Sequence, residues 1–215
     1  MIKLQGLSRE QVEEISRQTA DAFYDYKYHE ADRGLVKYIP SREAMLVYIG
    51  AIVRAAYKSG VLYATSPRHE GYLMLSGEGA GGSIGFFDGM RMIAAEKKAL
   101  GGFENMKKFV DACFCDGGTI ETRMRRAKRK FLRIEMLIVR KEYQGQGYMR
   151  QMMAYACGIA DNRRVPLILD TDDRNKAARY VHLGMTLDRV RDCGEGFRMY
   201  DLIRECGEPR KEERK

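Results

Sequence analysis

The chain has 215 residues, of which 45% are hydrophobic and 32% are charged, and its formal net charge is +8. No apolar run reaches the roughly 20 residues that a membrane-spanning helix needs, which excludes that class of protein. The opening stretch MIKLQGLSREQVEE lacks the apolar segment and cleavage site of a signal peptide, so a cytoplasmic location is expected. The positive charge suits an anionic ligand, an acidic substrate or nucleic acid.

The cysteines predict neither a disulfide framework nor a zinc site. They are odd in number and scattered: Cys113, Cys115, Cys157, Cys193 and Cys206. Cys113 and Cys115 are too close for a CxxC pair, and the chain has 3 histidines. We therefore expect reduced cysteines that mostly pack in the core, and no metal.

Hydrophobic periodicity and capping residues divide the chain into helices and strands. Ser8 with Gln11 forms a capping-box pattern, and Ser41 caps the second helix. In chain order we expect helices at 8–27 and 41–58, a hairpin of strands 61–65 and 71–76, two helices within 84–130 broken at Gly101–Gly102, a strand at 131–139, a helix after Gly147, a strand at 166–170, a helix at 174–184, and a closing hairpin of 185–192 and 196–203.

The order of these elements predicts a single α/β domain over residues 1–215. No internal repeat and no interdomain linker is visible. The strand at 131–139, FLRIEMLIV, is nearly all apolar at its centre, as a buried central strand should be. A charged tail from about 205 to 215 ends the chain.

The stretch GEGAGGSIG at 77–85 matches the dinucleotide pattern G-x-G-x-x-G through Gly77, Gly79 and Gly82. That fingerprint requires a helix and then a second parallel strand with an acidic residue near its end. Residues 84–130 instead predict helices and no strand. A surface loop on the substrate side is the favoured interpretation.

The basic run RMRRAKRK, residues 123–130, has two interpretations. It could bind nucleic acid or phosphate, or it could be a solvated helix face that leads into the next strand. No aromatic residues interleave with it, as a base-stacking surface would need, so the second interpretation is favoured.

Gly145 and Gly147 lie where the strand at 131–139 passes to a helix whose apolar face includes Met152 and Met153. Glycines let the backbone turn its N–H groups towards one point. The start of a helix adds unpaired N–H groups and the positive end of the helix dipole. The pattern predicts an anion site, best suited to phosphate. It is not a Walker loop, because no Gly-Lys-Ser/Thr follows.

With these residues in place, the sequence resembles the GNAT superfamily of acyl-CoA N-acyltransferases. The family signature Gln/Arg-x-x-Gly-x-Gly/Ala lies between a central strand and a helix, and QGQGYM at 144–149 occupies that position. The motif-bearing part covers about 131–187. The downstream matches to the family's Asn and Tyr-x-x-x-Gly-Phe positions are Asn175, Tyr180, Gly184 and Met185.

The resemblance implies an α/β (α+β) fold with a GNAT-like mixed central sheet, two splayed parallel strands and flanking helices. It also implies acetyl-CoA as co-substrate. The implied contacts to acetyl-CoA are Leu137, Ile138, Val139, Gln144, Gly145, Gln146, Gly147, Tyr148, Met149, Arg150 and Asn175. Two positions depart from the family: Met149 replaces a small residue, and Val139-Arg140-Lys141 replaces Val-x-Pro. Met149 could crowd the pyrophosphate or could point into the core.

The implied reaction is direct attack of an amine on the thioester. Such an amine arrives protonated and must lose a proton. Glu135, flanked by Ile134 and Met136, is the candidate base if burial raises its pKa; otherwise it is a surface carboxylate paired with Arg133, and a water relay remains open. By the resemblance, Tyr180 protonates the leaving thiolate. A backbone N–H near Leu137 is the expected oxyanion donor.

Three functions compete on the sequence. The first is an N-acetyltransferase that moves an acetyl group from acetyl-CoA to a primary amine. The second is a non-catalytic protein of the same fold that binds CoA or another anion, and the third is a basic nucleic-acid-binding protein. The first is favoured, with a small molecule or peptide as the amine acceptor and neither a membrane nor nucleic acid as a partner. The sequence identifies neither the acceptor nor the oligomeric state.

Overall fold

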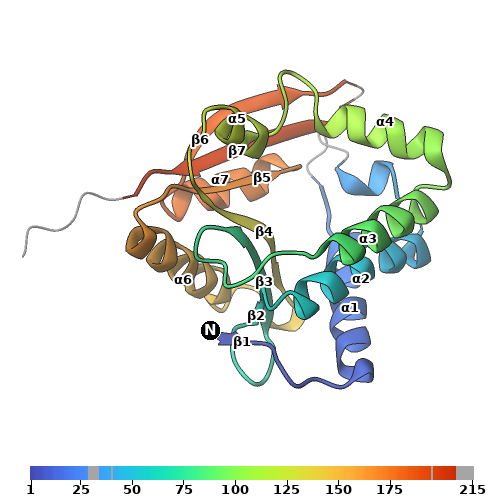
Figure 1. Cartoon of the computed structure of the whole chain (residues 1–215), viewed down its shortest axis with the longest axis horizontal. Coiled ribbons are helices and arrows are strands. Elements are labelled where there is room, and N and C mark those ends of the chain that lie inside the picture. The colour runs from blue at the N-terminus through green and yellow to red at the C-terminus, as the bar shows by residue number, and fades with distance from the viewer. Residues whose placement is uncertain (29–33, 40, 195, 207–215) are drawn as a thin grey trace, which may run out of the picture.

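The computed structural model describes residues 1–28, 34–39, 41–194 and 196–206, which build a seven-stranded sheet flanked by helices (Figure 1). The strand order is β1-β2-β3-β4-β5-β7-β6, and among the described residues β4–β5 is the one parallel pair. The expected mixed sheet is confirmed. From residue 207 onwards, the predicted charged tail lies outside the described residues.

The bounds of the elements follow the chain from the N-terminus. They are β1 (Ile2–Lys3), α1 (Arg9–Tyr24), the 3-10 helix η1 (Leu35–Lys37), α2 (Arg42–Lys58), β2 (Leu62–Ala64), β3 (Gly71–Gly77), α3 (Phe86–Ala99), α4 (Phe103–Cys113), α5 (Ile120–Arg126), β4 (Leu132–Val139), the 3-10 helix η2 (Lys141–Tyr143), α6 (Tyr148–Arg163), β5 (Leu167–Thr171), α7 (Arg174–His182), β6 (Thr186–Asp192) and β7 (Arg198–Arg204).

Most of the predicted elements are present, and their caps explain where they begin. The capping box of α1 forms in both directions, with Gln11 N–H donating to the Ser8 hydroxyl at 3.3 Å and Ser8 N–H donating to the Gln11 side chain at 2.8 Å. Ser41 caps α2 in one direction, with its hydroxyl accepting from Ala44 N–H at 3.0 Å. The two predicted hairpins pair antiparallel, as β2–β3 and β6–β7.

Residues 84–130 contain three helices, whereas the sequence predicts two. The predicted break at Gly101–Gly102 is present, with φ values of 75° and 132°. A second break follows at Gly117–Gly118, where φ is 84° and 91°. Thr119 then caps the short helix α5 by accepting from Thr122 N–H at 3.1 Å. A helix of seven residues carries too few apolar positions to show a helical period, which is why the sequence pattern missed it.

The glycine-rich stretch at 77–85 is structural and does not form a dinucleotide site. β3 is antiparallel to both of its neighbours, so no parallel βαβ unit begins there. A Cβ at Gly77 would lie 2.4 Å from the carbonyl oxygen of Phe131, and one at Gly82 would lie 1.9 Å from that of Ser59. These glycines are needed because two backbones approach closely.

The sheet has apolar residues on both faces, and helices cover each of them. Ile168 of β5 packs with Ile120 and Met124 of α5. The alternate residues Leu167 and Leu169 belong to the larger core cluster, which includes residues of α7. Figure 1 shows α5 in front of the sheet and α7 behind it. Strand β5 is therefore sandwiched, which fits its continuous apolar sequence.

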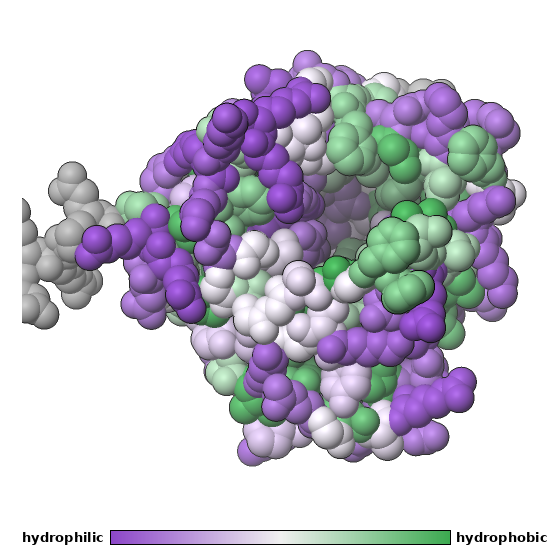
Figure 2. Space-filling model, in the orientation of Figure 1, coloured by the Kyte–Doolittle hydropathy of each residue, from purple (hydrophilic) through white to green (hydrophobic). Residues whose placement is uncertain are grey.

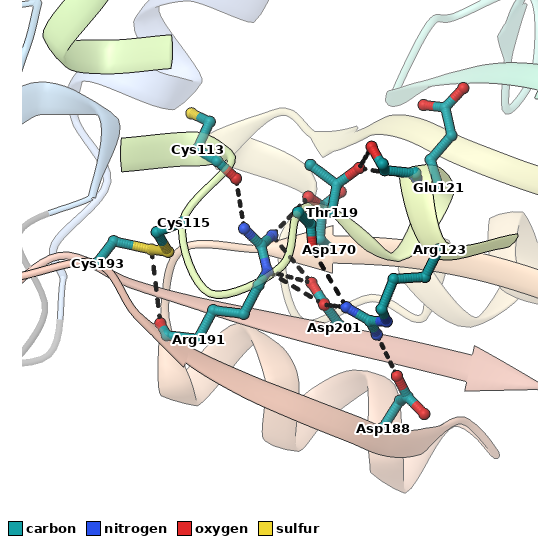
Figure 3. Close-up of polar contacts among 12 residues, drawn as sticks. Cys113, Cys115, Thr119, Glu121, Arg123, Asp170, Asp188, Arg191, Cys193 and Asp201 are labelled. Atoms are coloured by element: carbon teal, nitrogen blue, oxygen red, sulfur yellow. Dashed lines mark hydrogen bonds and ion pairs between the residues drawn. A yellow bond between two sulfur atoms is a disulfide. The ribbon is translucent and has the colours of Figure 1, made fainter. Parts of the chain in front are cut away.

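A buried network of charges joins α5, β5 and the β6–β7 hairpin (Figure 3). Arg191 and Asp201 are fully buried, and the Arg191 guanidinium lies 3.0 Å from one oxygen of Asp201 and 3.3 Å from Asp170. Arg191 also donates to the carbonyl oxygen of Cys113. Arg123 approaches the other oxygen of Asp201 to 2.6 Å. Each buried charge in this group thus has an opposite partner.

A disulfide joins Cys115 to Cys193, with the two Cα atoms 5.5 Å apart. The expectation that all five cysteines are reduced is therefore wrong. The bond links the α4–α5 turn to the β6–β7 turn across 78 positions in sequence. No spacing rule reaches that far, because only the fold brings the two turns together. Cys113 and Cys157 are free and half-buried.

The basic run at 123–130 forms the end of α5 and the turn into β4, as the second interpretation of the sequence requires. Several of its side chains form ion pairs within the chain: Arg125 with Glu121 at 2.7 Å, Arg129 with Glu205 at 2.8 Å and Lys130 with Glu78 at 3.2 Å. Most of these side chains are exposed. Within the described ranges, no helix is long and apolar enough to cross a membrane.

Replacing Arg191 by Met should lower the free energy of unfolding by about 3 kcal/mol, because it leaves the buried Asp170 and Asp201 carboxylates short of a partner. Denaturant unfolding of both proteins, kept under the same redox conditions, measures the change. The control is Arg189→Met on the same strand, since Arg189 is exposed and should change stability by less than about 0.5 kcal/mol. Equal stability of the two variants would contradict this account of the network.

Candidate active site

β4 and β5 separate soon after they begin to pair. The parallel register contains Leu132 opposite Leu167 and Arg133 opposite Ile168, and it extends no further in the described residues. Beyond Arg133, β4 is paired only with β3, while β5 continues beside β7 over all of its residues. The second half of β4 therefore presents an open edge, as the predicted splay requires.

The hydrogen bonds of β4 show which backbone groups face the open edge. Arg140 N–H donates to the carbonyl oxygen of Glu70 at 2.9 Å, on the β3 side. Backbone groups alternate in direction along an antiparallel strand, so those of Leu137 and Val139 point away from β3. An extended ligand arm could pair with them as an added strand would.

Glu135 is the extra residue of a β-bulge. Met136 is opposite Met74 and Ile134 is opposite Leu75, which leaves Glu135 without a partner on β3. Bulges of this kind redirect a side chain and are frequent beside active sites. The sequence gives no sign of the bulge, because it depends on the register with β3.

The Glu135 carboxylate combines both of the alternatives that the sequence left open. It is paired with Arg133, whose Nε lies 3.3 Å from it, and it accepts a hydrogen bond from the Ser76 hydroxyl. Its side chain is 24% exposed. Burial raises the pKa of Glu135 above its ordinary value, although the Arg133 guanidinium and the Ser76 hydroxyl act to lower it.

The loop after β4 has the geometry of an anion site. Gly145 and Gly147 have φ values of 77° and 86°, and an added Cβ would meet nothing within 4 Å at either position. Glycine is needed there for its backbone conformation and not for space. The first hydrogen bond of α6 runs from Gln151 N–H to Gly147 O at 3.1 Å. The N–H groups of residues 148–150 therefore have no acceptor within the helix.

Two glutamine side chains fasten this loop to its own backbone. Gln144 Nε2 donates to the carbonyl oxygen of Val139 at 3.2 Å, and Gln146 Nε2 donates to that of Glu142 at 3.0 Å. Gln144 lines a cavity that this loop borders, whereas Gln146 is exposed and does not line it. Met149 lines the cavity and also packs against the core, so it takes part in both arrangements that the sequence allowed.

Glu70 supports the loop from the β2–β3 turn, a role that the sequence analysis missed. The buried Glu70 carboxylate accepts hydrogen bonds from Thr65 and Ser66, at 2.8 and 2.7 Å, and the Tyr148 hydroxyl lies 3.4 Å from it. Burial raises its pKa, but the hydroxyl hydrogen bonds outweigh burial and bring the pKa to about 2. Glu70 stays ionised at neutral pH. Thr65 and Ser66 are close to Glu70 in sequence, but Tyr148 meets it only when the hairpin packs against α6, so no local pattern marks its role at the loop.

The open edge and the loop border a cavity of about 840 Å³. Figure 2 shows one face of the molecule hollowed, with hydrophobic side chains gathered on the α3–α4 side of the hollow. Eleven of the predicted site residues line the cavity: Glu135, Leu137, Ile138, Val139, Gln144, Gly145, Gly147, Tyr148, Met149, Arg150 and Tyr180. Gln146 and Asn175 do not line it.

The two residues predicted on α7 lie in different surroundings. Asn175 is exposed in the first turn, outside the cavity lining. Tyr180 is 8% exposed and lines the cavity. Burial, followed by the nearby charge of Asp172, raises the pKa of the Tyr180 hydroxyl, which therefore keeps its proton at neutral pH.

The far end of the cavity is aromatic and was not predicted. Phe109 of α4 and Phe197 of the β6–β7 turn line it, and each ring centroid lies 5.2 Å from that of Tyr38. Asp170 and Asp172 complete this end, together with residues of α1 and α7. In the described part of the chain, no group of three or more His, Cys, Asp or Glu residues is placed to hold a metal ion.

Comparison with known families and structures agrees with this geometry. Residues 112–185 match the model described as the acetyltransferase (GNAT) family. This segment contains β4, the glycine loop, α6, β5 and α7, so the resemblance to the GNAT superfamily is confirmed. A search of curated proteins finds no match.

Solved acetyltransferases share the fold. A structure of histone acetyltransferase HPA2 and related acetyltransferase from Corynebacterium glutamicum matches with 11% identity, 98% coverage of this chain, 99% of that chain and a TM-score of 0.58. Another solved acetyltransferase matches with 15% identity, 94% and 98% coverage and a TM-score of 0.52. The match to nourseothricin acetyltransferase has 22% identity and a TM-score of 0.33, and it covers 36% of this chain and about half (51%) of that one. The first two matches, whose TM-scores are 0.58 and 0.52, show that the chain has the GNAT fold.

Proposed function

We propose that this protein is an acetyl-CoA-dependent N-acetyltransferase that transfers the acetyl group directly to a primary amine. The observation that carries the proposal is that three features border one cavity. These are the open edge of β4, the glycine loop at the start of α6, and a carboxyl group of raised pKa facing that space. We assign the whole of residues 1–215 to one such domain.

The residues of the site fit acetyl-CoA as a co-substrate. The backbone groups of Leu137 and Val139 would pair with the amides of the pantetheine arm. The N–H groups at the start of α6 would receive the pyrophosphate, which the helix dipole favours. Arg150 and Arg179 line the same cavity and would add positive charge. Asn175 is too exposed to support the contact that the resemblance implies, so its assignment rests on the resemblance alone.

Glu135 would remove the proton from the acceptor. An alkylamine is almost fully protonated at neutral pH and cannot attack the thioester in that form. A carboxylate with a raised pKa accepts a proton more readily than an ordinary one. Glu135 would act directly or through one water, since it lies at the bulge of β4 and lines the cavity.

Tyr180 would supply the proton that the leaving CoA thiolate takes up. Attack by the amine forms the C–N bond, and the C–S bond breaks to release the thiolate. The raised pKa of Tyr180 keeps its proton available until that moment. A backbone N–H near Leu137 would stabilise the negative charge on the carbonyl oxygen during attack.

The alternative is a protein that binds CoA without turnover, and Met149 is the observation behind it. Its side chain lines the cavity at the position where the family usually has a small residue.

We further propose a cytoplasmic location, where reducing thiols would act on the Cys115–Cys193 bond.

Replacing Tyr180 by Phe should lower kcat by about 10²-fold, because the general acid is lost while the ring is kept. Affinity for acetyl-CoA, measured by calorimetry, should change by less than about threefold, since the variant removes one hydroxyl. Tyr155→Phe on α6, outside the cavity lining, is the matched control and should keep full activity. Unchanged turnover in Tyr180→Phe would remove Tyr180 from the mechanism.

The rate should rise with pH through the pKa of Glu135, because the base works only when ionised. Since that pKa is raised, the rising limb should lie above the ordinary range of a glutamate. Glu135→Gln should lower kcat about 10²-fold and abolish this limb. Glu142→Gln, which alters an exposed carboxylate near the loop, should keep both the rate and the profile. A wild-type limb that persists in Glu135→Gln would assign it to another group.

A further inference from the structure

Lys176 fills an ammonium site at the far, aromatic end of the cavity, which we call the acceptor end. Its Nζ lies 4.0 Å from the ring centroid of Tyr26, 4.8 Å from that of Tyr28 and 6.0 Å from that of Phe23. It also lies 2.9 Å from one oxygen of Asp172. Aromatic faces around a cation next to a carboxylate form a receptor for an ammonium group. We call these four partners of Lys176 the cation cage.

The cation cage is held in place by contacts that do not involve the Lys176 ammonium. The Tyr28 hydroxyl donates to the second oxygen of Asp172 at 2.8 Å, and Leu35 N–H donates to the same oxygen at 2.9 Å. The Tyr26 hydroxyl donates to Asp173 at 2.8 Å. The rings and the carboxylate would therefore keep their positions if the lysine side chain were shortened.

The other carboxylates of the cavity are already balanced by arginines of the chain. Glu135 pairs with Arg133, and Asp170 lies 2.8 Å from Arg133 and 3.3 Å from Arg191. Arg191 is fully buried and cannot move aside for a ligand. Among the described acidic residues that line the cavity, Asp172 has the lysine as its basic partner.

The rest of the acceptor end is apolar. Phe109 and Phe197 present aromatic surface, and Leu35 and Met199 line the same end. A second positive charge on an acceptor would thus meet aromatic side chains, a carboxylate that an arginine already pairs, or the Lys176 ammonium itself. An apolar body would meet surface that matches it.

We propose that Lys176 is a specificity-determining residue. Its own ammonium occupies the cation cage and so restricts the acceptor to amines with one positive charge and an apolar, preferably aromatic, body. This inference rests on the proposed transferase function and names its substrate class. The position of Lys176 supports it, since residues four apart share a helix face and Tyr180 lies four positions further along α7.

The test compares two acceptors, 2-phenylethylamine and 1,5-diaminopentane, by the rate of CoA thiol release. The wild-type protein should prefer the aromatic monoamine by at least about tenfold in kcat/KM. Lys176→Met removes the ammonium and keeps an apolar side chain of similar length. It should raise kcat/KM for the diamine by about tenfold and change the value for the monoamine by less than about threefold.

Two variants serve as controls. Lys176→Arg keeps a cation in the cage and should preserve the wild-type preference. Lys58→Met breaks another Lys–Asp pair, the one with Asp88 at 3.1 Å. Neither residue lines the cavity, so this variant should leave the preference unchanged. Lys176→Ala is a second variant without the ammonium, in case Lys176→Met does not fold. The thermal midpoint of each variant shows whether it is folded.

A binding measurement separates this inference from the transferase proposal. Calorimetric titration with 1,5-diaminopentane should give affinity at least about tenfold higher for Lys176→Met than for the wild type. Equal affinity, or a diamine preference that does not respond to the substitution, would overturn the role of Lys176 and leave the transferase proposal standing. Tighter diamine binding without acetylation of either amine would refute the proposed function, and with it the substrate class.

Discussion

The site depends on one constraint, the separation of strands β4 and β5. The two strands share two residue pairs, and the salt bridge from Arg133 of β4 to Asp170 of β5 lies just beyond the last of them. Arg191 holds Asp170 from the β6 side. The same Arg133 pairs with Glu135, the bulged residue. One group of buried charges thus supports both the opening of the sheet and the carboxyl group that faces the opening.

The sheet can open at little energetic cost because each strand keeps a full partner on its other side. β4 stays paired with β3 up to Val139, and β5 stays paired with β7. The open edge lies within a cavity, where it cannot recruit a strand from another molecule as an exposed edge would. Its backbone groups still need partners, and Gln144 already supplies one at the Val139 carbonyl.

The sequence predicts the parts of this structure that depend on near neighbours. The Ser8 cap, the helix that contains Met152 and Met153, and the turn at Gly145 and Gly147 all follow from local spacing. The remaining features depend on residues that are distant in sequence. The Cys115–Cys193 bond, the Glu135 bulge opposite β3 and the Tyr28–Asp172 hydrogen bond each need the tertiary fold before they exist. The family resemblance assigned both Asn175 and Tyr180 to the site. Only Tyr180 lines the cavity.

The most direct test of the central claim, that the open edge and the loop form a site for acetyl-CoA, is a calorimetric titration with acetyl-CoA and with NAD as the control ligand. We expect micromolar affinity for acetyl-CoA and no binding of NAD. We also expect at least tenfold weaker binding of acetyl-CoA, about 1.4 kcal/mol, in Gly147→Val, because a β-branched residue is strained at the φ of 86°. No binding of acetyl-CoA by the folded wild-type protein would contradict the account.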